Sequence, residues 1–393
     1  MKKLMIVGAS VLQLPAVLKA KEMGLEVAVV DFNPQAMGIP YADKYYNAST
    51  MDEDAVTAAA VDYRPDGIMT LATDMPMRGV AKASEKLHLH SICYETAVKA
   101  TDKFEMIKAF KEYGVSSPWY FDVDSFEDLK ALDGKVSFPC IIKPTDNAGS
   151  HGVVKVQDFE ELLANYEYSH SCSRHGKVIV EEYLDGPEVS VEVMVVNGEV
   201  HIIQITDKIT TGAPHFVEMG HTQPSRLPNE TQRQIREVAT AACESLGLDK
   251  GPAHVEMKVT QRGSVMIELG ARMGGDNITT HLVPLSTGID MVGSTIKVAL
   301  GEEPDIIPTL NCGSAIRYFE VPFGTIKAIE GVDAAKRIPG VKQITFTKEV
   351  GEESTPIHCS NDRIGFVIAQ GATAEEAAEV CEEAMKAVRI EIQ

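Results

Sequence analysis

Glu256 and Glu268 are the residues whose type and spacing point most directly to chemistry. They lie in residues 251–275, GPAHVEMKVTQRGSVMIELGARMGG, which predict two strands joined by a short turn centred on Arg262. Alternate side chains of a strand point to the same face. In this register the apolar pairs that share one face are Val255 with Leu269, Met257 with Ile267, and Val259 with Val265. Glu256 then faces Glu268 on the opposite face.

Two carboxylates in this position repel one another. Like charges opposed across an antiparallel pair destabilise it, and neighbouring carboxylates cannot both stay ionised without a partner or a shifted pKa. A hard divalent cation would remove the conflict, because Mg²⁺ takes one or two carboxylates and completes its shell with substrate phosphates and water. The alternative is a solvent-facing hairpin in which Lys258 and Arg272 neutralise the two acids.

The bulk composition limits the kinds of partner. The chain has 393 residues, of which 44% are hydrophobic and 24% charged, and this suits two or three globular domains. A net charge of −20 argues against a general binder of nucleic acid or of anionic membranes. The cysteines are scattered without zinc-ligand spacing, and no apolar run approaches membrane-spanning length. We therefore expect a cytoplasmic protein with reduced thiols.

The N-terminal residues predict a parallel sheet. Residues 4–7 and 27–31 read as strands on either side of a helix, and such βαβ units build doubly wound parallel sheets. Gly8 and Asp31 lie where a dinucleotide-binding unit holds its cofactor, so a dinucleotide-dependent oxidoreductase is one alternative. The other two glycines of that fingerprint are missing. Asp74, after a further strand, either faces a ligand crevice or only caps a loop.

Strands and helices continue along the rest of the chain. The regular segments that we predict are a helix at 102–113 with Thr101 as its N-cap, strands at 138–142 and 177–182, a hairpin of strands 189–196 and 200–205, a helix at 230–246, a helical region from 276 to 300, strands at 314–321 and 364–369, and a final helix at 373–387. Residues 206–228 show no clear periodicity, and we expect a long loop there that holds Lys208, His215, Glu218 and His221. A loop of that length inside a compact domain is usually functional or mobile.

A glycine-rich loop, DNAGSHGV at residues 146–153, follows the strand that ends at Lys143. Glycines allow backbone N–H groups to approach phosphates closely. The loop lacks the Gly-Lys-Ser/Thr of a Walker loop. Taken alone, it also fits an ordinary hairpin turn.

In order along the chain, these features resemble the ATP-grasp superfamily. The resemblance implies an α/β fold in three parts: an N-terminal doubly wound parallel α/β domain over residues 1–100, a two-lobed ATP-grasp domain with antiparallel sheets over residues 101–300, and a small C-terminal α+β region over residues 301–393. Within the second part, a small mobile lobe is expected at about residues 115–185. Each motif is common by itself, whereas the full series at these separations is specific.

The resemblance also implies a role for each residue that carries it. ATP is the implied nucleotide, with Mg²⁺ or Mn²⁺ as the metal. The implied roles are phosphate contacts for Lys103 and Lys143, closure over the phosphates for Gly149, Ser150 and Gly152, adenine contacts for Glu181, Glu182 and Leu184, a ribose contact for Glu188, metal ligation for Glu256 and Glu268, and neutralisation of an acyl phosphate or leaving phosphate for Arg272.

One position departs from the superfamily pattern. The second metal carboxylate often opens a Glu-x-Asn-x-Arg motif, whereas this chain has Gly270 in place of the Asn. Glycine has no side chain to ligate a metal. Either water completes the shell, or the nearby Asn277 substitutes.

Two segments, residues 210–218 and 268–276, look like the carboxylate–amine ligases related to bacterial L-amino-acid ligases. This likeness implies an enzyme that joins a carboxylate to an amine, with amino acids as substrates, through an acyl phosphate and with release of ADP. Glu218 or His215 would then bind or deprotonate the attacking amine, with His221 nearby. The alternative is that these polar residues only cover the surface.

Three rival functions stay open. A purine-biosynthesis ligase of the same superfamily would need a ribose-phosphate site, and residues 1–100 show no extra cationic cluster for one. The oxidoreductase named above is the second. A non-catalytic nucleotide-binding regulator is the third, and it leaves the paired carboxylates and Arg272 without a role. The expected partners are small-molecule carboxylates and amines, and a homodimer is the commonest assembly for a protein of this kind.

Overall fold

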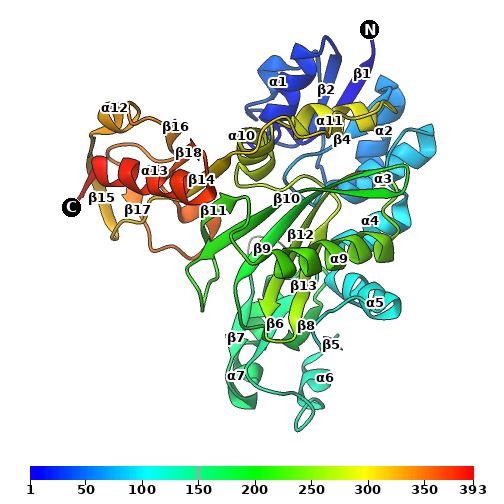
Figure 1. Ribbon diagram of the computed structural model, residues 1–393. Coiled ribbons are helices and arrows are strands. Elements are labelled where there is room, and N and C mark those ends of the chain that lie inside the picture. Colours follow the sequence, from blue (N-terminus) through cyan, green and yellow to red (C-terminus); the bar gives the residue numbers. More distant parts are fainter. Residues whose placement is uncertain (148–150) are drawn as a thin grey trace.

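Four parallel strands form the N-terminal sheet of the computed structural model, which describes residues 1–147 and 151–393. Their order is β3-β2-β1-β4. The elements are β1 (Lys3–Val7), α1 (Leu14–Glu22), β2 (Glu26–Asp31), η1 (Ile39–Tyr41), β3 (Lys44–Asn47), α2 (Glu53–Tyr63), β4 (Gly67–Met69) and α3 (Met77–Leu87). Buried side chains of α2 and α3 pack on one face of the sheet, and those of α1 pack on the other together with the distant α11 (Met291–Ala299). Figure 1 shows α11 lying across this domain. The predicted doubly wound parallel domain is confirmed.

Gly8 and Asp31 have structural roles at the first turn. The Asp31 carboxylate accepts hydrogen bonds from the backbone N–H of Ala9 at 2.8 Å and of Asn33 at 2.9 Å. A Cβ on Gly8, whose φ is +103°, would lie 2.8 Å from the buried side chain of Gln13. The space beside the turn is therefore filled by Gln13, and this arrangement does not favour the oxidoreductase alternative.

Two helices connect the N-terminal sheet to the centre of the molecule. They are α4 (Tyr94–Thr101) and α5 (Lys103–Tyr113). The predicted N-cap, Thr101, is wrong, because Thr101 ends α4. Asp102 caps α5 by accepting the backbone N–H groups of Phe104 and Glu105. A carboxylate caps a helix as well as a hydroxyl does, so composition alone could not distinguish the two neighbouring residues.

A small lobe has its own antiparallel sheet, in the order β5-β8-β6-β7. Its elements are β5 (Tyr120–Val123), α6 (Phe126–Lys130), β6 (Cys140–Pro144), β7 (Val154–Val156), α7 (Phe159–Ala164), α8 (Tyr166–Ser171) and β8 (Val178–Glu182). A separate hydrophobic core, which includes Val123, Ile142, Leu162 and Val180, fills the lobe. In Figure 1 it lies at the bottom, farthest from the N-terminal domain.

An eight-stranded antiparallel sheet forms the body of the molecule, in the order β13-β12-β9-β10-β11-β14-β18-β16. The strands are β9 (Glu188–Val196), β10 (Glu199–Thr210), β11 (Glu218–Gln223), β12 (Gly251–Thr260), β13 (Gly263–Gly270), β14 (Gly313–Tyr318), β16 (Val341–Phe346) and β18 (Gly365–Gly371). α4, α5 and α9 (Asn229–Leu246) pack on its β9–β12–β13 part. This one sheet contains strands from both sides of the boundary predicted after residue 300. The domain boundaries therefore stay a prediction.

The long loop predicted at residues 206–228 is wrong. β10 continues to Thr210, and β11 pairs with it from Glu218 onward. These strands bury polar side chains, among them Lys208 and His221. The sequence of these strands therefore lacks the alternation of apolar and polar residues that is typical of a strand, although the backbone is extended. The pattern looked like a loop because buried ion pairs take the place of apolar residues.

The hairpin register is right where the two carboxylates lie and wrong beyond them. Val255 pairs with Leu269 and Glu256 pairs with Glu268, as predicted. A bulge after Glu256 then shifts the pairing. Met257 faces Met266 instead of Ile267, and Val259 faces Ser264 instead of Val265. A bulge inserts one unpaired residue into a strand, which no two-residue periodicity can reveal.

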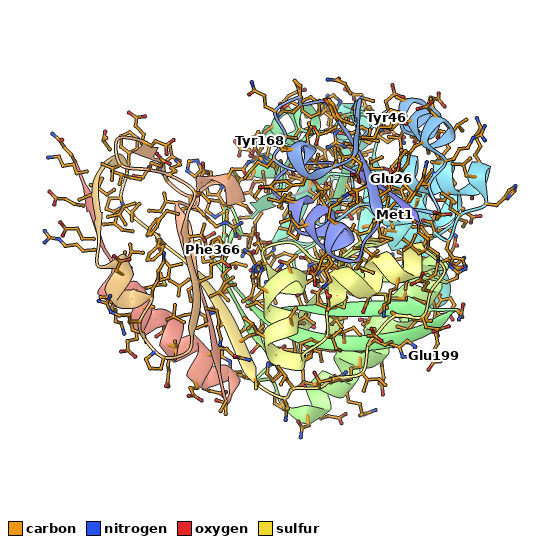
Figure 2. All side chains as sticks on the ribbon, turned by 90° about the horizontal axis from the view of Figure 1, so that it is seen from above. Met1, Glu26, Tyr46, Tyr168, Glu199 and Phe366 are labelled. Atoms are coloured by element: carbon orange, nitrogen blue, oxygen red, sulfur yellow. The ribbon has the colours of Figure 1, made fainter. Side chains whose placement is uncertain are left out.

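The C-terminal region closes the far end of the large sheet. Its remaining elements are β15 (Gly324–Glu330), α12 (Val332–Ala335), β17 (Glu353–Ser354), η3 (Ser360–Asp362), α13 (Ala374–Ala387) and β19 (Arg389–Ile392). Before it, η2 (Ile278–Leu282), a short π-helix, and α10 (Val283–Thr287) follow β13. α13 packs on β14 and β18. Seen from above, Phe366 lies on this side of the molecule, apart from Glu26 and Tyr46 of the N-terminal domain (Figure 2). No helix in the described residues is long and apolar enough to cross a membrane.

Candidate active site

One cavity of about 320 Å³ brings together most of the predicted site residues. It lies where the small lobe, the large sheet and the carboxyl end of β4 meet. The predicted residues that line it are Lys103, Lys143, Glu181, Glu182, Leu184, Glu188, Glu218, Glu256, Glu268 and Arg272. They come from seven different segments, so only the folded chain can assemble them.

Two described residues of the predicted set, Gly152 and His215, do not line the cavity. Gly149 and Ser150 lie outside the described residues. Gly152 is beside the cavity, with a φ of +80° and with a hypothetical Cβ only 2.7 Å from that of Cys172. His215 lies elsewhere, with its ring 4.5 Å from the ring of His358. Among the described residues, no hydrogen bond or ion pair joins His215 to another predicted site residue.

Each hairpin carboxylate is held by a lysine from a different element. Lys103 Nζ, at the start of α5, lies 2.9 Å from Glu268. Lys208 Nζ, on β10, lies 2.9 Å from Oε1 of Glu256. Burial alone would lower the pKa of Lys103, but the charge of Glu268 outweighs it and the pKa lies above its usual value. Both carboxylates are partly buried, with 24% and 25% of their side-chain surface exposed.

The neutralising partners expected for a solvent-facing hairpin are wrong. Lys258 binds Glu188 at 3.1 Å, and Arg272 binds Asp74 at 2.8 Å. The Asp74 partner raises the pKa of the Arg272 guanidinium against the opposing effect of burial. Asp74 therefore faces the cavity and orients Arg272. Of the two roles left open for Asp74, a residue that faces a crevice and a loop cap, the structure favours the first.

Lys208 was not among the predicted site residues, yet it connects three of them. Its ammonium lies 2.6 Å from Glu188, 2.9 Å from Glu256 and 3.4 Å from Glu218, and 2% of its side chain is exposed. Burial would lower its pKa, but the charges of the three glutamates hold the pKa well above the usual value. A charged lysine thus compensates three carboxylates inside the cavity.

A buried histidine completes the support of Glu256. His254 Nε2 lies 3.1 Å from Glu256 Oε1, and its Nδ1 lies 2.7 Å from Glu192, which is fully buried. Burial opposes the charge on His254, but Glu192 outweighs it and raises the pKa to about 9. Both Lys208 and His254 contact Oε1 of Glu256. Its second oxygen makes no hydrogen bond within the described residues.

The small lobe supplies a second set of contacts. Lys143 on β6 binds Glu181 on β8 at 2.5 Å, and both side chains are buried. Apolar lining residues, including Ile141 and Met266, lie in the same cavity. In the described part of the chain, the backbone N–H and C=O of Leu184 make no hydrogen bond. A flat heterocycle could therefore find apolar contact and backbone hydrogen bonds there.

The C-terminal region holds Asp276, a residue that lines the cavity. Arg363 makes two hydrogen bonds of 2.8 Å to the two carboxylate oxygens of Asp276. His221 Nε2 lies 3.3 Å from the same carboxylate, and Tyr318 lies under the Arg363 guanidinium at 3.8 Å. Burial would raise the pKa of Asp276, but Arg363 and His221 hold it far below its usual value. Nothing in the local sequence indicates this pairing, since 87 residues separate the partners.

The carboxylates fit a hard divalent cation. Among the described residues, no group of three or more His, Cys, Asp or Glu is arranged to hold a metal. A cation held by Glu256 and Glu268 would have two carboxylate ligands, and phosphate oxygens and water would have to complete its shell, as is usual for Mg²⁺. Asn277 is not among the residues that line the cavity.

Comparison with known proteins agrees with this geometry. Residues 136–281 match the ATP-grasp domain model, and residues 317–393 match the L-amino acid ligase C-terminal domain 2. The chain is 30% identical over 316 residues to the alanine–anticapsin ligase of Bacillus subtilis, covering 74% of this chain and 66%, about two thirds, of that protein. It is 24% identical over 389 residues to the formate-dependent phosphoribosylglycinamide formyltransferase of Saccharolobus solfataricus, covering 96% and 94%.

A solved structure extends the likeness to the whole fold. The crystal structure of an L-amino acid ligase from Bacillus licheniformis superposes with a TM-score of 0.86 at 25% identity, covering 100% of this chain and 99% of that one. The α/β fold of the whole chain is thus shared with a ligase.

Proposed function

Because the chain belongs to the ATP-grasp superfamily of ligases, we propose that it joins the carboxylate of one amino acid to the amine of another, with ATP consumed and ADP and phosphate released. The observation that carries the proposal is the pairing of Glu256 with Glu268 in one cavity with Lys103, Lys143 and Arg272. The names of the similar ligases support amino acids as the substrate class.

The nucleotide would lie between the small lobe and the large sheet. Adenine would contact Ile141 and Met266 and bond to the free backbone groups of Leu184. Glu188 would accept hydrogen bonds from the ribose, and Lys143 would exchange Glu181 for phosphate oxygens, as Lys103 would exchange Glu268. Each exchange replaces one charge-assisted contact by another, so binding need not leave a charge unpaired.

Glu256 and Glu268 would hold Mg²⁺. When bound, the ion would neutralise phosphate charge and polarise the phosphoryl group for transfer. Lys208 and His254 keep Oε1 of Glu256 occupied, which leaves its other oxygen for the metal.

In the first step, a carboxylate oxygen of one substrate attacks the γ-phosphorus. The bond between this phosphorus and the bridging oxygen breaks, and ADP keeps the electron pair. Phosphoryl transfer depends mainly on positioning and charge neutralisation. Lys103 would stabilise the negative charge on the phosphates, while Arg272, oriented by Asp74, would bind the oxygens of the transferred group.

In the second step, the amine nitrogen of the other substrate attacks the acyl carbon, and the bond from that carbon to the phosphate oxygen breaks. The nitrogen must lose a proton. Glu218 is the base we propose, because it lines the cavity beside Lys208, whereas His215 does not. Water must be kept out, since an exposed acyl phosphate would hydrolyse.

The proposal is tested by ADP release with pairs of amino acids and by mass spectrometry of the products. Glu268→Ala and Lys143→Ala should each abolish amino-acid-dependent ADP release. Arg236→Ala is a suitable control, because Arg236 is exposed on α9 and is not among the residues that line the cavity. Thermal unfolding would show that all three variants are folded. Unchanged turnover in both site variants would overturn the assignment.

A purine-biosynthesis ligase is the second candidate. The observation that favours it is the similarity over nearly the full length to a phosphoribosylglycinamide formyltransferase. Mass spectrometry of products formed from ATP, glycine and phosphoribosylamine separates the two. A phosphoribosylated product, with no product from amino-acid pairs, would favour the purine reaction.

A further inference from the structure

A second cavity, of about 250 Å³, lies on the other side of Lys103 from the nucleotide site. The residues that line both this cavity and the main cavity are Asp74, Lys103, Asn147 and Glu268. At its other end it is bounded by Met51, which is 48% exposed, and by the exposed Arg174 and His175. The cavity thus connects the reaction centre with the surface. We call it the Arg78 cavity, after one of the two arginines that line it.

The acids of the Arg78 cavity already have partners. Glu53 accepts a hydrogen bond from the Tyr94 hydroxyl at 3.0 Å. Asp146 accepts the backbone N–H groups of Arg174 and His175 at 3.0 and 3.1 Å. Asp74 and Glu268 bind Arg272 and Lys103, as described above. None of these carboxylates contacts the guanidinium of Arg78.

Arg78 is held in place by a neutral hydrogen-bond partner. Its Nε donates a hydrogen bond of 2.7 Å to Oγ1 of Thr101, which in turn donates to the carbonyl of Ala97. Within the residues that the structure describes, neither terminal nitrogen of Arg78 has a hydrogen-bond or ion-pair partner. The guanidinium of Arg174, in the same cavity, likewise has none in that part of the chain.

Two unpaired guanidinium groups in one cavity are unexpected in a chain of net charge −20. A guanidinium presents parallel N–H groups that match the oxygens of a carboxylate or phosphate. Because Thr101 already orients Arg78, little side-chain entropy is lost on binding. We propose that the Arg78 cavity binds a small oxyanion, either a carboxylate or inorganic phosphate, next to the reaction centre.

The two sources of this oxyanion follow from the proposed function, on which this part of the inference rests. The reaction takes in a carboxylate and releases phosphate, and Lys103 and Glu268 border both cavities. A carboxylate substrate could be held there before transfer. Phosphate could instead leave through the Arg78 cavity while the nucleotide cleft is still occupied by ADP.

The first experiment measures binding without turnover. Inorganic phosphate or acetate is titrated into the protein while a non-hydrolysable ATP analogue and Mg²⁺ fill the main cavity, and thermal stability and heats of binding are recorded. We expect Arg78→Gln to weaken binding of at least one anion by roughly 10- to 100-fold, as for a lost charge-assisted hydrogen bond. Arg236→Gln, at an exposed arginine of α9, should bind like the parent protein. Failure of the proposed ligase reaction would leave this binding result intact.

A second variant keeps the proposal testable if Arg78→Gln does not fold. Thr101→Val keeps the charge of Arg78 and the size of the side chain at residue 101, but it removes the hydroxyl that orients Arg78. It should therefore weaken anion binding by a smaller factor. Kinetics then separates the sources: an increased KM for the carboxylate substrate indicates the substrate, whereas lost product inhibition by phosphate with an unchanged KM indicates the product. If Arg78→Gln and Thr101→Val bind both anions as tightly as Arg236→Gln, the inference is wrong.

Discussion

Asp74 occupies the space that a side chain at Gly270 would fill. A Cβ built on Gly270 would lie 2.5 Å from Oδ1 of Asp74 and 2.9 Å from the central carbon of the Arg272 guanidinium. The asparagine that related enzymes often carry at this position would therefore collide with the pair that orients Arg272. Oδ1 of Asp74 is buried and has no hydrogen-bond partner in the described structure. The glycine is thus a requirement of the Asp74–Arg272 pair.

Gly270→Asn should consequently destabilise the protein. Overpacking of this kind costs about 1–3 kcal/mol, and displaced Arg272 should also lower turnover. The double variant Asp74→Ala/Gly270→Asn makes room for the amide and should recover part of the lost stability. Urea unfolding of the single and double variants measures both effects. A Gly270→Asn protein as stable as the parent would contradict this account.

Lys208→Met should be strongly destabilising in the absence of metal. Removing one partner of a buried ion pair typically costs about 3–5 kcal/mol, and here three carboxylates lose their shared cation. Because Mg²⁺ would replace part of the missing charge, it should raise the Tm of the variant more than that of the parent. Lys177→Met is the matched control, since its partner Asp124 is exposed and the pair is worth about 1 kcal/mol or less. Equal losses in the two variants would refute the compensating role of Lys208.

Glu192→Gln and His254→Gln should weaken metal binding although both leave the proposed ligands, Glu256 and Glu268, in the sequence. Residues that orient a ligand typically contribute about 10- to 100-fold to metal affinity. Mn²⁺ can be titrated into the ADP-bound protein and followed by electron paramagnetic resonance. His201→Gln, at a partly exposed histidine on β10, serves as control. Unchanged Mn²⁺ affinity in both variants would show that the His254–Glu192 pair does not position Glu256.

Asp276→Asn should change the acid sensitivity of the fold. Burial works against the charged form, but Arg363 and His221 hold the folded-state pKa below the ordinary value of 3.8. The stabilisation is therefore present above about pH 4 and is lost as the pH falls below it. At pH 7 the variant should be less stable by roughly 3 kcal/mol. Urea unfolding at several pH values should show this difference shrinking toward pH 2, and a constant difference would contradict the assignment.

The sequence predicted the site wherever a local pattern sets the geometry. Glu256 and Glu268 pair as expected because Val255 and Leu269 must both face the core, and a shift of one residue would turn them to the cavity. The order of Lys103, Lys143 and Glu188 predicted their meeting through family resemblance. All of them line one cavity.

What could not be predicted depends on contacts between distant segments. Lys208 looks like a loop residue until three glutamates surround it, and Arg363 reaches Asp276 only because β14 and β18 join the large sheet. Asp74 could be read in two ways, because its partner Arg272 lies 198 residues away. Long-range ion pairs of this kind leave no periodicity in the sequence.

The eight-stranded sheet also determines which parts of the molecule can unfold separately. β11 is hydrogen-bonded on one side to β10 and on the other to β14 of the C-terminal region. Detaching residues after 312 would leave β11 as a bare edge ready to pair with another chain. We therefore expect the strands on both sides of β11 to unfold as one cooperative unit, so that their amide protons exchange together. The small lobe has a separate sheet and core, so we expect its amide protons to exchange independently of that unit.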